Sequence, residues 1–144
     1  MAILSTTDAS VDLVMSSDPD VDVELPQVSV PALDGGEPEL VDAPPRWCKV
    51  AEIRALGGEC RVGATVVSVR PLNGAEYCRI QALYRHQDGK VRDYTEAMLE
   101  TLRAGVVNVS HYDGGKDGLV STLRWDLVDG LVSLIWRASQ GYEI

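Results

Sequence analysis

The stretch TVVSVRPLNGAEYC, residues 65–78, decides the fold because it joins a strand pattern directly to a helix pattern. The β-branched run 65–69 favours a strand, and Pro71 ends it because proline cannot continue a hydrogen-bonded ladder. Asn73 and Glu76 are spaced as the Asn form of a capping box, in which each side chain accepts a hydrogen bond from the other residue's backbone N–H. A strand and then a capped helix are therefore predicted here.

The predicted helix covers 74–86, and a second strand-like run precedes the first. Apolar and polar residues recur at helical spacing along the helix, at Tyr77, Ile80, Gln81 and Tyr84. Upstream, Gly57-Gly58 is a hairpin signal, and 59–62 and 65–69 are predicted to belong to one small antiparallel sheet, with Gly63 as a bulge or second turn. Residues 50–56 fit a helical turn and a strand equally well.

Further helices are predicted downstream. One covers about 92–103 and stops at Gly105, and 106–109 could be a short strand. Glycines and aspartates at 113–118 indicate a loop. The last helix has the strongest pattern and stops at Gly141, and Gly130 inside it indicates close packing against a neighbour. Its apolar residues recur at three- and four-residue steps: Leu127, Val128, Leu131, Leu134, Ile135 and Ala138.

Charge divides the chain at residue 45. The first 45 residues hold ten acids, no Lys or Arg, no aromatic residue and six of the seven prolines, whereas the remainder carries a net charge of +1. Such a segment buries too little apolar surface to offset its ordering entropy. We therefore predict an α+β protein in which an extended acidic arm, 1–45, precedes a compact domain, 46–144, built from a small antiparallel sheet and about three helices. Deleting the arm should leave that domain folded.

The arm contains strand-like pieces at 11–15 and 21–30, where apolar residues alternate with acids. Such pieces can pair with the sheet edge of a partner, as extended segments do when they add a strand. They are the candidate partner-binding residues, seven in all: Val11, Leu13, Val21, Val23, Leu25, Val28 and Val30.

The residue types that carry chemistry form no recognisable constellation. The two histidines, His86 and His111, lie in turn-like contexts outside any nucleophile motif. The cysteines lack the paired spacing of zinc ligands, and they fit small core or surface residues of a reducing compartment. The acids at 18, 20 and 22 mimic half a calcium loop, but Val23 and Ser29 occupy the positions that require Gly and Glu. We predict no catalytic residue, cofactor or metal, and no enzyme activity.

Phosphate, nucleic-acid and membrane partners are disfavoured. The Gly114-Gly115-Lys116 run fits neither glycine-rich phosphate motif. The acidic balance and the scattered basic residues argue against nucleic acid. The chain contains no apolar stretch long enough to span a bilayer and no secretion signal at its start, which predicts a soluble protein made in a cytoplasm.

The segment VRPLNGAEY, residues 69–77, with Ile80 and Gln81 after it, resembles the core motif of bacteriophage tail assembly chaperones, "R-P-L-[TN]-G-x-E". The opening MAILSTT, the Gly105-Val106-Val107 run and a last helix ending in Ser139 are similar too. The resemblance covers most of 47–140. Two features depart from the family's pattern. The acidic arm is longer than the pattern has, and residues 58–65 look like an insertion in the hairpin. The resemblance implies no catalytic residues.

The resemblance implies a non-enzymatic protein that holds tape-measure and tube subunits in the host cytoplasm while a phage tail is built. The alternative is a permanent virion component, such as a capsid decoration, neck, tail or baseplate subunit. Either would bind other phage structural proteins and could also associate with copies of itself. A lesser alternative is an inhibitor whose acidic arm imitates nucleic acid, with binding that weakens steeply with salt.

Overall fold

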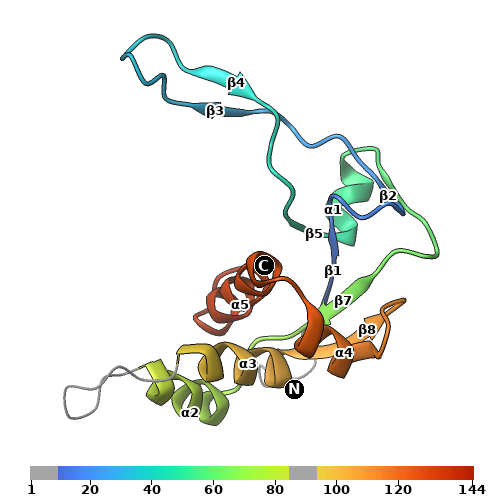
Figure 1. Cartoon of the computed structure of the whole chain (residues 1–144), viewed down its shortest axis with the longest axis vertical. Coiled ribbons are helices and arrows are strands. Elements are labelled where there is room, and N and C mark those ends of the chain that lie inside the picture. The colour runs from blue at the N-terminus through green and yellow to red at the C-terminus, as the bar shows by residue number, and fades with distance from the viewer. Residues whose placement is uncertain (1–9, 85–93) are drawn as a thin grey trace, which may run out of the picture.

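A computed structural model describes residues 10–84 and 94–144 and shows an α+β fold (Figure 1). Predictions that fall on 85–93, including the end of the first helix and His86, lie outside the described residues. The described residues form these elements in chain order: β1 Val11–Met15, β2 Val21–Asp22, β3 Val28–Val30, β4 Glu39–Val41, β5 Trp47–Lys49, α1 Val50–Ala55, β6 Glu59–Cys60, β7 Val66–Val69, α2 Gly74–Tyr84, α3 Tyr94–Gly105, β8 Val106–Ser110, α4 Gly115–Thr122 and α5 Trp125–Ser139.

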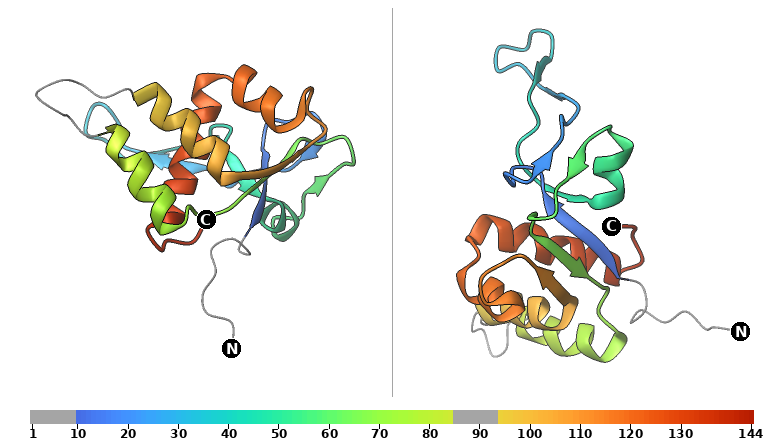
Figure 2. Two further views of the ribbon diagram at one scale, coloured as in Figure 1. Left: turned by 90° about the horizontal axis from the view of Figure 1, so that it is seen from below. Right: turned by 90° about the vertical axis from the view of Figure 1, so that its right-hand side faces the viewer.

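The main sheet has four strands in the order β5-β1-β7-β8, with antiparallel neighbours throughout. Leu13 of β1 lies opposite Lys49 on one side and opposite Val67 on the other. Two smaller antiparallel sheets, β2-β6 and β3-β4, have two strands each. The β3-β4 pair projects away from the helices (Figure 1 and the right-hand view of Figure 2).

Successive side chains of the sheet face two separate cores because a strand alternates its side chains between the two faces. Leu13, Trp47 and Val67 pack into the larger core with residues from α2, α3, α4 and α5. Their neighbours Val14, Cys48 and Val66 face a smaller core, which Ile53 of α1, Val21 and Ala64 complete. The helices α2 to α5 therefore cover one face of the sheet, and α1 with the β2-β6 pair covers part of the other.

The predicted turn from strand to helix at 69–77 is confirmed in detail. The Glu76 N–H donates to Asn73 Oδ1 at 2.9 Å, and the Asn73 N–H donates to Glu76 Oε1 at 3.0 Å. Arg70 adds a bidentate ion pair to the Glu76 carboxylate, with both distances 2.9 Å. The Leu72 N–H donates to Ser139 Oγ at 2.8 Å, which attaches the turn to the end of α5. The motif thus closes a turn and fixes it to the core.

The predicted last helix is also confirmed. α5 buries Val128, Leu131, Val132 and Ile135 along one face, and Gly141 follows it with a positive φ of 96°. Gly130 does pack closely: a Cβ there would lie 3.0 Å from Cδ1 of Trp47, whose Nε1 donates to the Leu127 carbonyl. The predicted loop at 113–118 is wrong from residue 115 onward, where α4 begins after the left-handed Gly114.

The predicted division at residue 45 is corrected by the structure. β1 lies inside the main sheet, and Leu13 is only 1% exposed. β2 pairs with β6, with Val21 opposite Cys60. The edges that these strand-like pieces need are therefore supplied by the same chain, and the folded part includes residues 11–25. The acids of this segment made it resemble a disordered arm, but they occupy turns and exposed strand positions. One of them is Asp12, whose carboxylate accepts a hydrogen bond from Ser68.

The prediction that 59–62 and 65–69 belong to one small sheet is wrong, because each segment pairs with a strand from residues 11–22. β7 pairs with β1 and β8, and β6 pairs with β2, so these neighbouring segments belong to different sheets. The ambiguous segment 50–56 forms the short helix α1. The strand predicted at 106–109 is confirmed as β8. Among the described helices, none is long and apolar enough to cross a bilayer.

Candidate protein-binding site

The β3-β4 pair forms a projecting hairpin, residues 27–42, which we call the acidic hairpin. Val28 lies opposite Val41 and Val30 opposite Glu39, and at its base Gln27 Nε2 donates to Asp42 Oδ1 at 3.3 Å. None of its apolar side chains belongs to either core. Leu33 at the tip is fully exposed and Leu40 is 67% exposed. An isolated two-stranded hairpin is only marginally stable in water, so this one is suited to gaining contacts from a partner.

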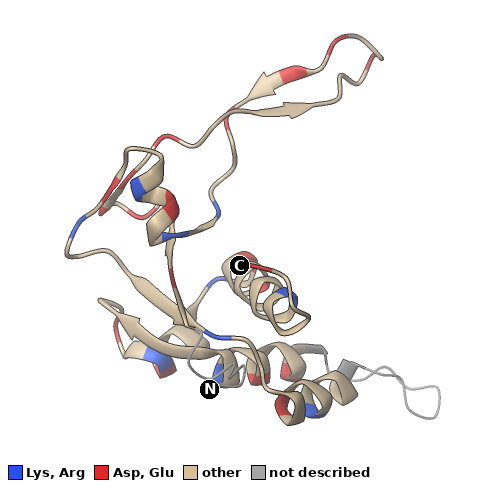
Figure 3. Ribbon diagram, turned by 180° about the vertical axis from the view of Figure 1, so that it is seen from behind, with Lys and Arg blue, Asp and Glu red and all other residues tan. Residues whose placement is uncertain are grey.

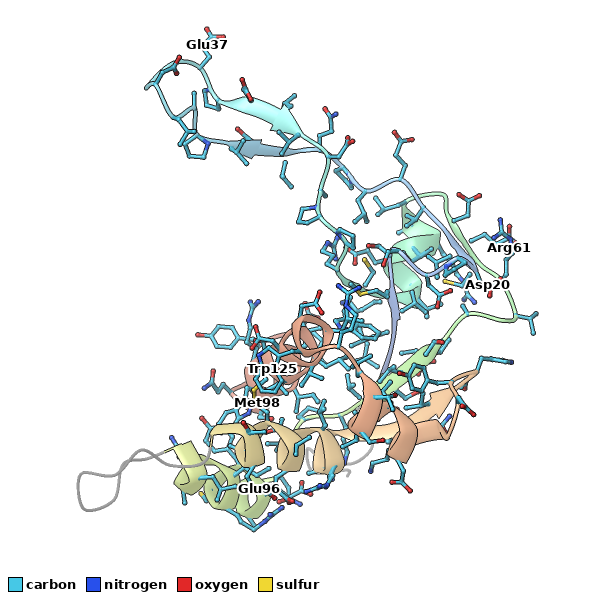
Figure 4. All side chains as sticks on the ribbon, viewed as in Figure 1. Asp20, Glu37, Arg61, Glu96, Met98 and Trp125 are labelled. Atoms are coloured by element: carbon cyan, nitrogen blue, oxygen red, sulfur yellow. The ribbon has the colours of Figure 1, made fainter. Side chains whose placement is uncertain are left out.

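All charged side chains of the acidic hairpin are negative. It contains four acids and no Lys or Arg: Asp34, Glu37, Glu39 and Asp42. Figure 3 shows red and no blue along this segment, and Figure 4 shows Glu37 at the tip, far from the helices. Exposed leucines and valines between carboxylates make a surface that combines hydrophobic contact with charge selection.

A cleft of about 800 Å³ lies between α5 and the segment that leads from the hairpin into β5. We call it the arginine cleft. Its apolar lining comes from Met15, Pro44, Pro45, Trp47, Leu127 and Leu134, and its polar lining from Ser17, Arg46, Arg124, Asp126, Ser133 and Arg137, with Gly130 between them. The α5 residues recur three and four positions apart, which places them along one face of that helix.

The three arginines of the cleft differ in how far they are neutralised. Arg46 makes a bidentate pair with Glu52, and this hydrogen bond holds the pKa of the Glu52 carboxyl below its ordinary value. Arg124 pairs with the exposed Asp126 at 2.7 Å. Arg137 stacks on the Tyr142 ring, with 5.7 Å from its guanidinium carbon to the ring centroid, and it makes no ion pair with any described residue. Arg137 therefore leaves the cleft with a positive charge available to a carboxylate.

Exposed aromatic residues accompany these arginines at the two ends of α5. Trp125, 53% exposed, stands between Arg124 and Asp126, and Tyr142 lies against Arg137. Trp, Tyr and Arg are the residue types most enriched where binding energy concentrates in protein interfaces. Sequence reasoning assigned α5 to the core and missed its second face. The spacing of residues 127, 130, 134 and 137, which recur every three or four positions, was the sequence signal for this second face of α5.

The seven predicted partner-binding residues separate into two groups. Val11 and Leu13 lie in the main sheet, Val21 pairs with β6, and Val23 and Leu25 pack against the smaller core. These five are engaged within the chain. Val28 and Val30 are exposed on the acidic hairpin and stay candidates for contact with a partner.

Other groups considered from the sequence serve local structure. Asp18 accepts hydrogen bonds from the Asp20 and Thr65 N–H groups, so it fixes a turn to the start of β7. Figure 4 shows Asp20 beside Arg61, whose backbone N–H donates to the Asp20 carbonyl. Burial raises the pKa of the Cys48 thiol. Within 10–84 and 94–144, no three His, Cys, Asp or Glu side chains converge as metal ligands would.

Comparison of the chain with family models, with curated proteins and with solved structures gives no match.

Proposed function

We propose that this chain is a non-enzymatic protein of bacteriophage morphogenesis, similar in role to a tail assembly chaperone, which binds other phage structural proteins in the host cytoplasm. Its partners in this role are tail tube, tape-measure, capsid or baseplate subunits. The observation that carries the proposal is the acidic hairpin, which exposes Leu33 and Leu40 outside both cores.

Binding through the acidic hairpin follows from its energetics. Its exposed apolar side chains gain about 25 cal/mol for each Å² that a partner removes from water. Four carboxylates keep the free hairpin soluble and disfavour acidic partners. A hairpin joined to a separately stabilised domain can therefore engage and release a partner while the domain remains folded.

A second candidate function is a permanent structural component of the virion. The observation that favours it is the presence of two unlike surfaces on one small chain, an acidic hairpin and an arginine-lined cleft. Repeating assemblies need two such surfaces on each subunit, because each copy must contact a neighbour on either side.

Quantitative mass spectrometry of infected cells and of purified mature particles tests the proposal. Peptides of this chain in complexes with tail proteins in cells, and their absence from particles, are expected for the chaperone role. Stoichiometric peptides in particles would assign the structural role. Recovery of the chain without phage structural proteins in both samples would contradict the proposed function altogether.

A further inference from the structure

We propose that the arginine cleft of one copy receives the acidic hairpin of a second copy, so that the chain associates with itself. This inference rests on the proposed function in one respect, because it identifies another copy of this chain as one of the structural proteins that the hairpin binds.

The two surfaces are complementary in charge. The cleft carries Arg46, Arg124 and Arg137, of which Arg46 pairs with Glu52 and Arg124 with Asp126, so one positive charge is left over at Arg137. The hairpin carries four carboxylates and no basic residue. Arg137 is the central donor, because its guanidinium lies over the Tyr142 ring and makes no ion pair with any described residue. A carboxylate from the hairpin can pair with it in two parallel hydrogen bonds, the strongest form of charge-assisted contact.

The two surfaces also match in their apolar parts. Leu33 and Leu40 are exposed on the hairpin, whereas Met15, Leu127 and Leu134 line the cleft together with two prolines. Apolar contact of this kind supplies most of the binding free energy, and the charged pairs at the rim select the orientation and speed the encounter. The exposed Tyr142 ring, which lies against Arg137 of the cleft, adds apolar surface at this end.

The hairpin of the same molecule is held away from its own cleft. Pro44 and Pro45 line the cleft and join it to the hairpin, and Pro26 precedes the hairpin on the other strand. Proline fixes its own φ and keeps the preceding residue extended, so these connections do not fold back sharply. In Figure 1 and in the right-hand view of Figure 2 the hairpin points away from α5. The cleft is therefore open to a hairpin from another copy.

The contact joins unlike surfaces, which limits the assemblies that it can build. Two copies that exchange hairpins form a closed dimer, whereas head-to-tail docking forms a ring or an open chain. Both outcomes raise the mass above the 15.6 kDa of one chain.

Light scattering after size exclusion tests this inference on the full chain. The expected mass is a multiple of the monomer mass, and raising the salt concentration should weaken the association because it screens the carboxylate–arginine pairs. Arg137→Glu should weaken self-association on the order of tenfold or more, because it replaces an attraction by a repulsion. Arg54→Glu, an equal charge change on the exposed face of α1, should leave the mass unchanged.

A mixing experiment tests the two surfaces together. The first variant replaces 27–42 by a short glycine linker, which can close because Val28 and Val41 are paired neighbours at the hairpin base. The second is Arg124→Glu with Arg137→Glu. Each should be monomeric alone, with the circular dichroism of a folded protein. Mixed together, they should form a one-to-one complex, in which the intact hairpin of the second variant occupies the intact cleft of the first.

A monomeric wild-type chain at every concentration measured would overturn the inference. So would a hairpin-deleted variant that keeps the wild-type mass, or two monomeric variants that do not associate when mixed. A monomeric chain that is still recovered with phage structural proteins from infected cells would overturn self-association alone and leave the proposed function standing.

Discussion

Glu76 accepts hydrogen bonds from two different residues, and this shows why the motif at 69–77 is recognisable in the sequence. Its carboxylate binds both terminal nitrogens of Arg70 and the backbone N–H of Asn73. The side chains of Arg70 and Glu76 are 16% and 21% exposed, so solvent screens this pair less than an ion pair on the surface. The residues that carry the resemblance to tail assembly chaperones therefore stabilise a turn between β7 and α2.

Replacing Glu76 by Gln should lower the free energy of unfolding by about 1–2 kcal/mol at pH 7, because the variant loses a charged partner of Arg70 and weakens the helix cap. The hydrogen bond from Arg70 holds the pKa of folded Glu76 below its ordinary value, against the opposing effect of burial. This stabilisation is therefore present above the unfolded pKa of about 4.3 and is lost as the pH falls through the folded pKa.

Urea unfolding of wild type and Glu76→Gln at several pH values checks this prediction. The difference between the two proteins should be largest near neutral pH and should shrink in acid. Glu143→Gln, at an exposed position, is the control and should show no such trend. A difference that stayed constant from pH 7 to pH 3 would argue against the role given to the ion pair.

Gly105 shows a second constraint at the level of single residues. A Cβ there would lie 2.7–3.1 Å from three side-chain atoms of Ile135, which is fully buried. Gly105→Ala should therefore lower the unfolding free energy by about 1–3 kcal/mol through overpacking. Gly74→Ala, where no atom lies within 4 Å of the added Cβ, should be neutral or slightly stabilising. Thermal melts of the two variants give the comparison, and equal melting temperatures would refute it.

At the level of elements, β1 is the strand that composition misassigned. The pattern at 11–15 predicts a strand correctly, but the acids and prolines around it placed that strand in an arm. Pairing with β5 and β7 is a contact between segments far apart in sequence, and local patterns do not encode it. α4 was missed for a related reason, since glycines that indicate a loop begin this helix instead.

The position of β1 predicts a contrast between two leucines that the sequence placed in the same arm. Leu13→Ala should lower the unfolding free energy by about 2–5 kcal/mol, because it leaves a cavity in the larger core. Leu33→Ala at the hairpin tip should change it by less than about 0.5 kcal/mol. Chemical unfolding of both variants measures the two values. Similarly small changes in the unfolding free energy for both variants would show that β1 is not part of the folded core.

Two deletions test whether β1 belongs to the folded domain while the acidic hairpin does not. Removing residues 1–45 should abolish the cooperative thermal transition, because it removes a central strand of the main sheet. This outcome is the reverse of the expectation from composition. Replacing only 27–42 by a short linker should leave the transition within a few degrees of wild type, because that segment contributes to neither core. Circular dichroism during heating distinguishes the two outcomes.

At the level of the whole molecule, the sequence was sufficient for the α+β class, for α2, α3 and α5, and for the strand at β8. It was insufficient for the arginine cleft, because that surface forms only when Pro44 and Pro45 lie opposite the 127–137 face of α5. Of the ten acids that composition assigned to an arm, four lie on the projecting hairpin, whereas five lie between residues 12 and 24 in the folded part (Figure 3).

We propose that a domain folded with β1 inside it presents the acidic hairpin for docking. Hydrogen exchange of the dilute free chain and of the same chain in its phage complex tests this most directly. We expect slow exchange at 11–15 in both states, and exchange at 27–42 that is fast in the free chain and slow in the complex. Fast exchange at 11–15 would show that β1 is not part of the folded domain, and exchange at 27–42 that does not change on binding would show that the hairpin does not dock.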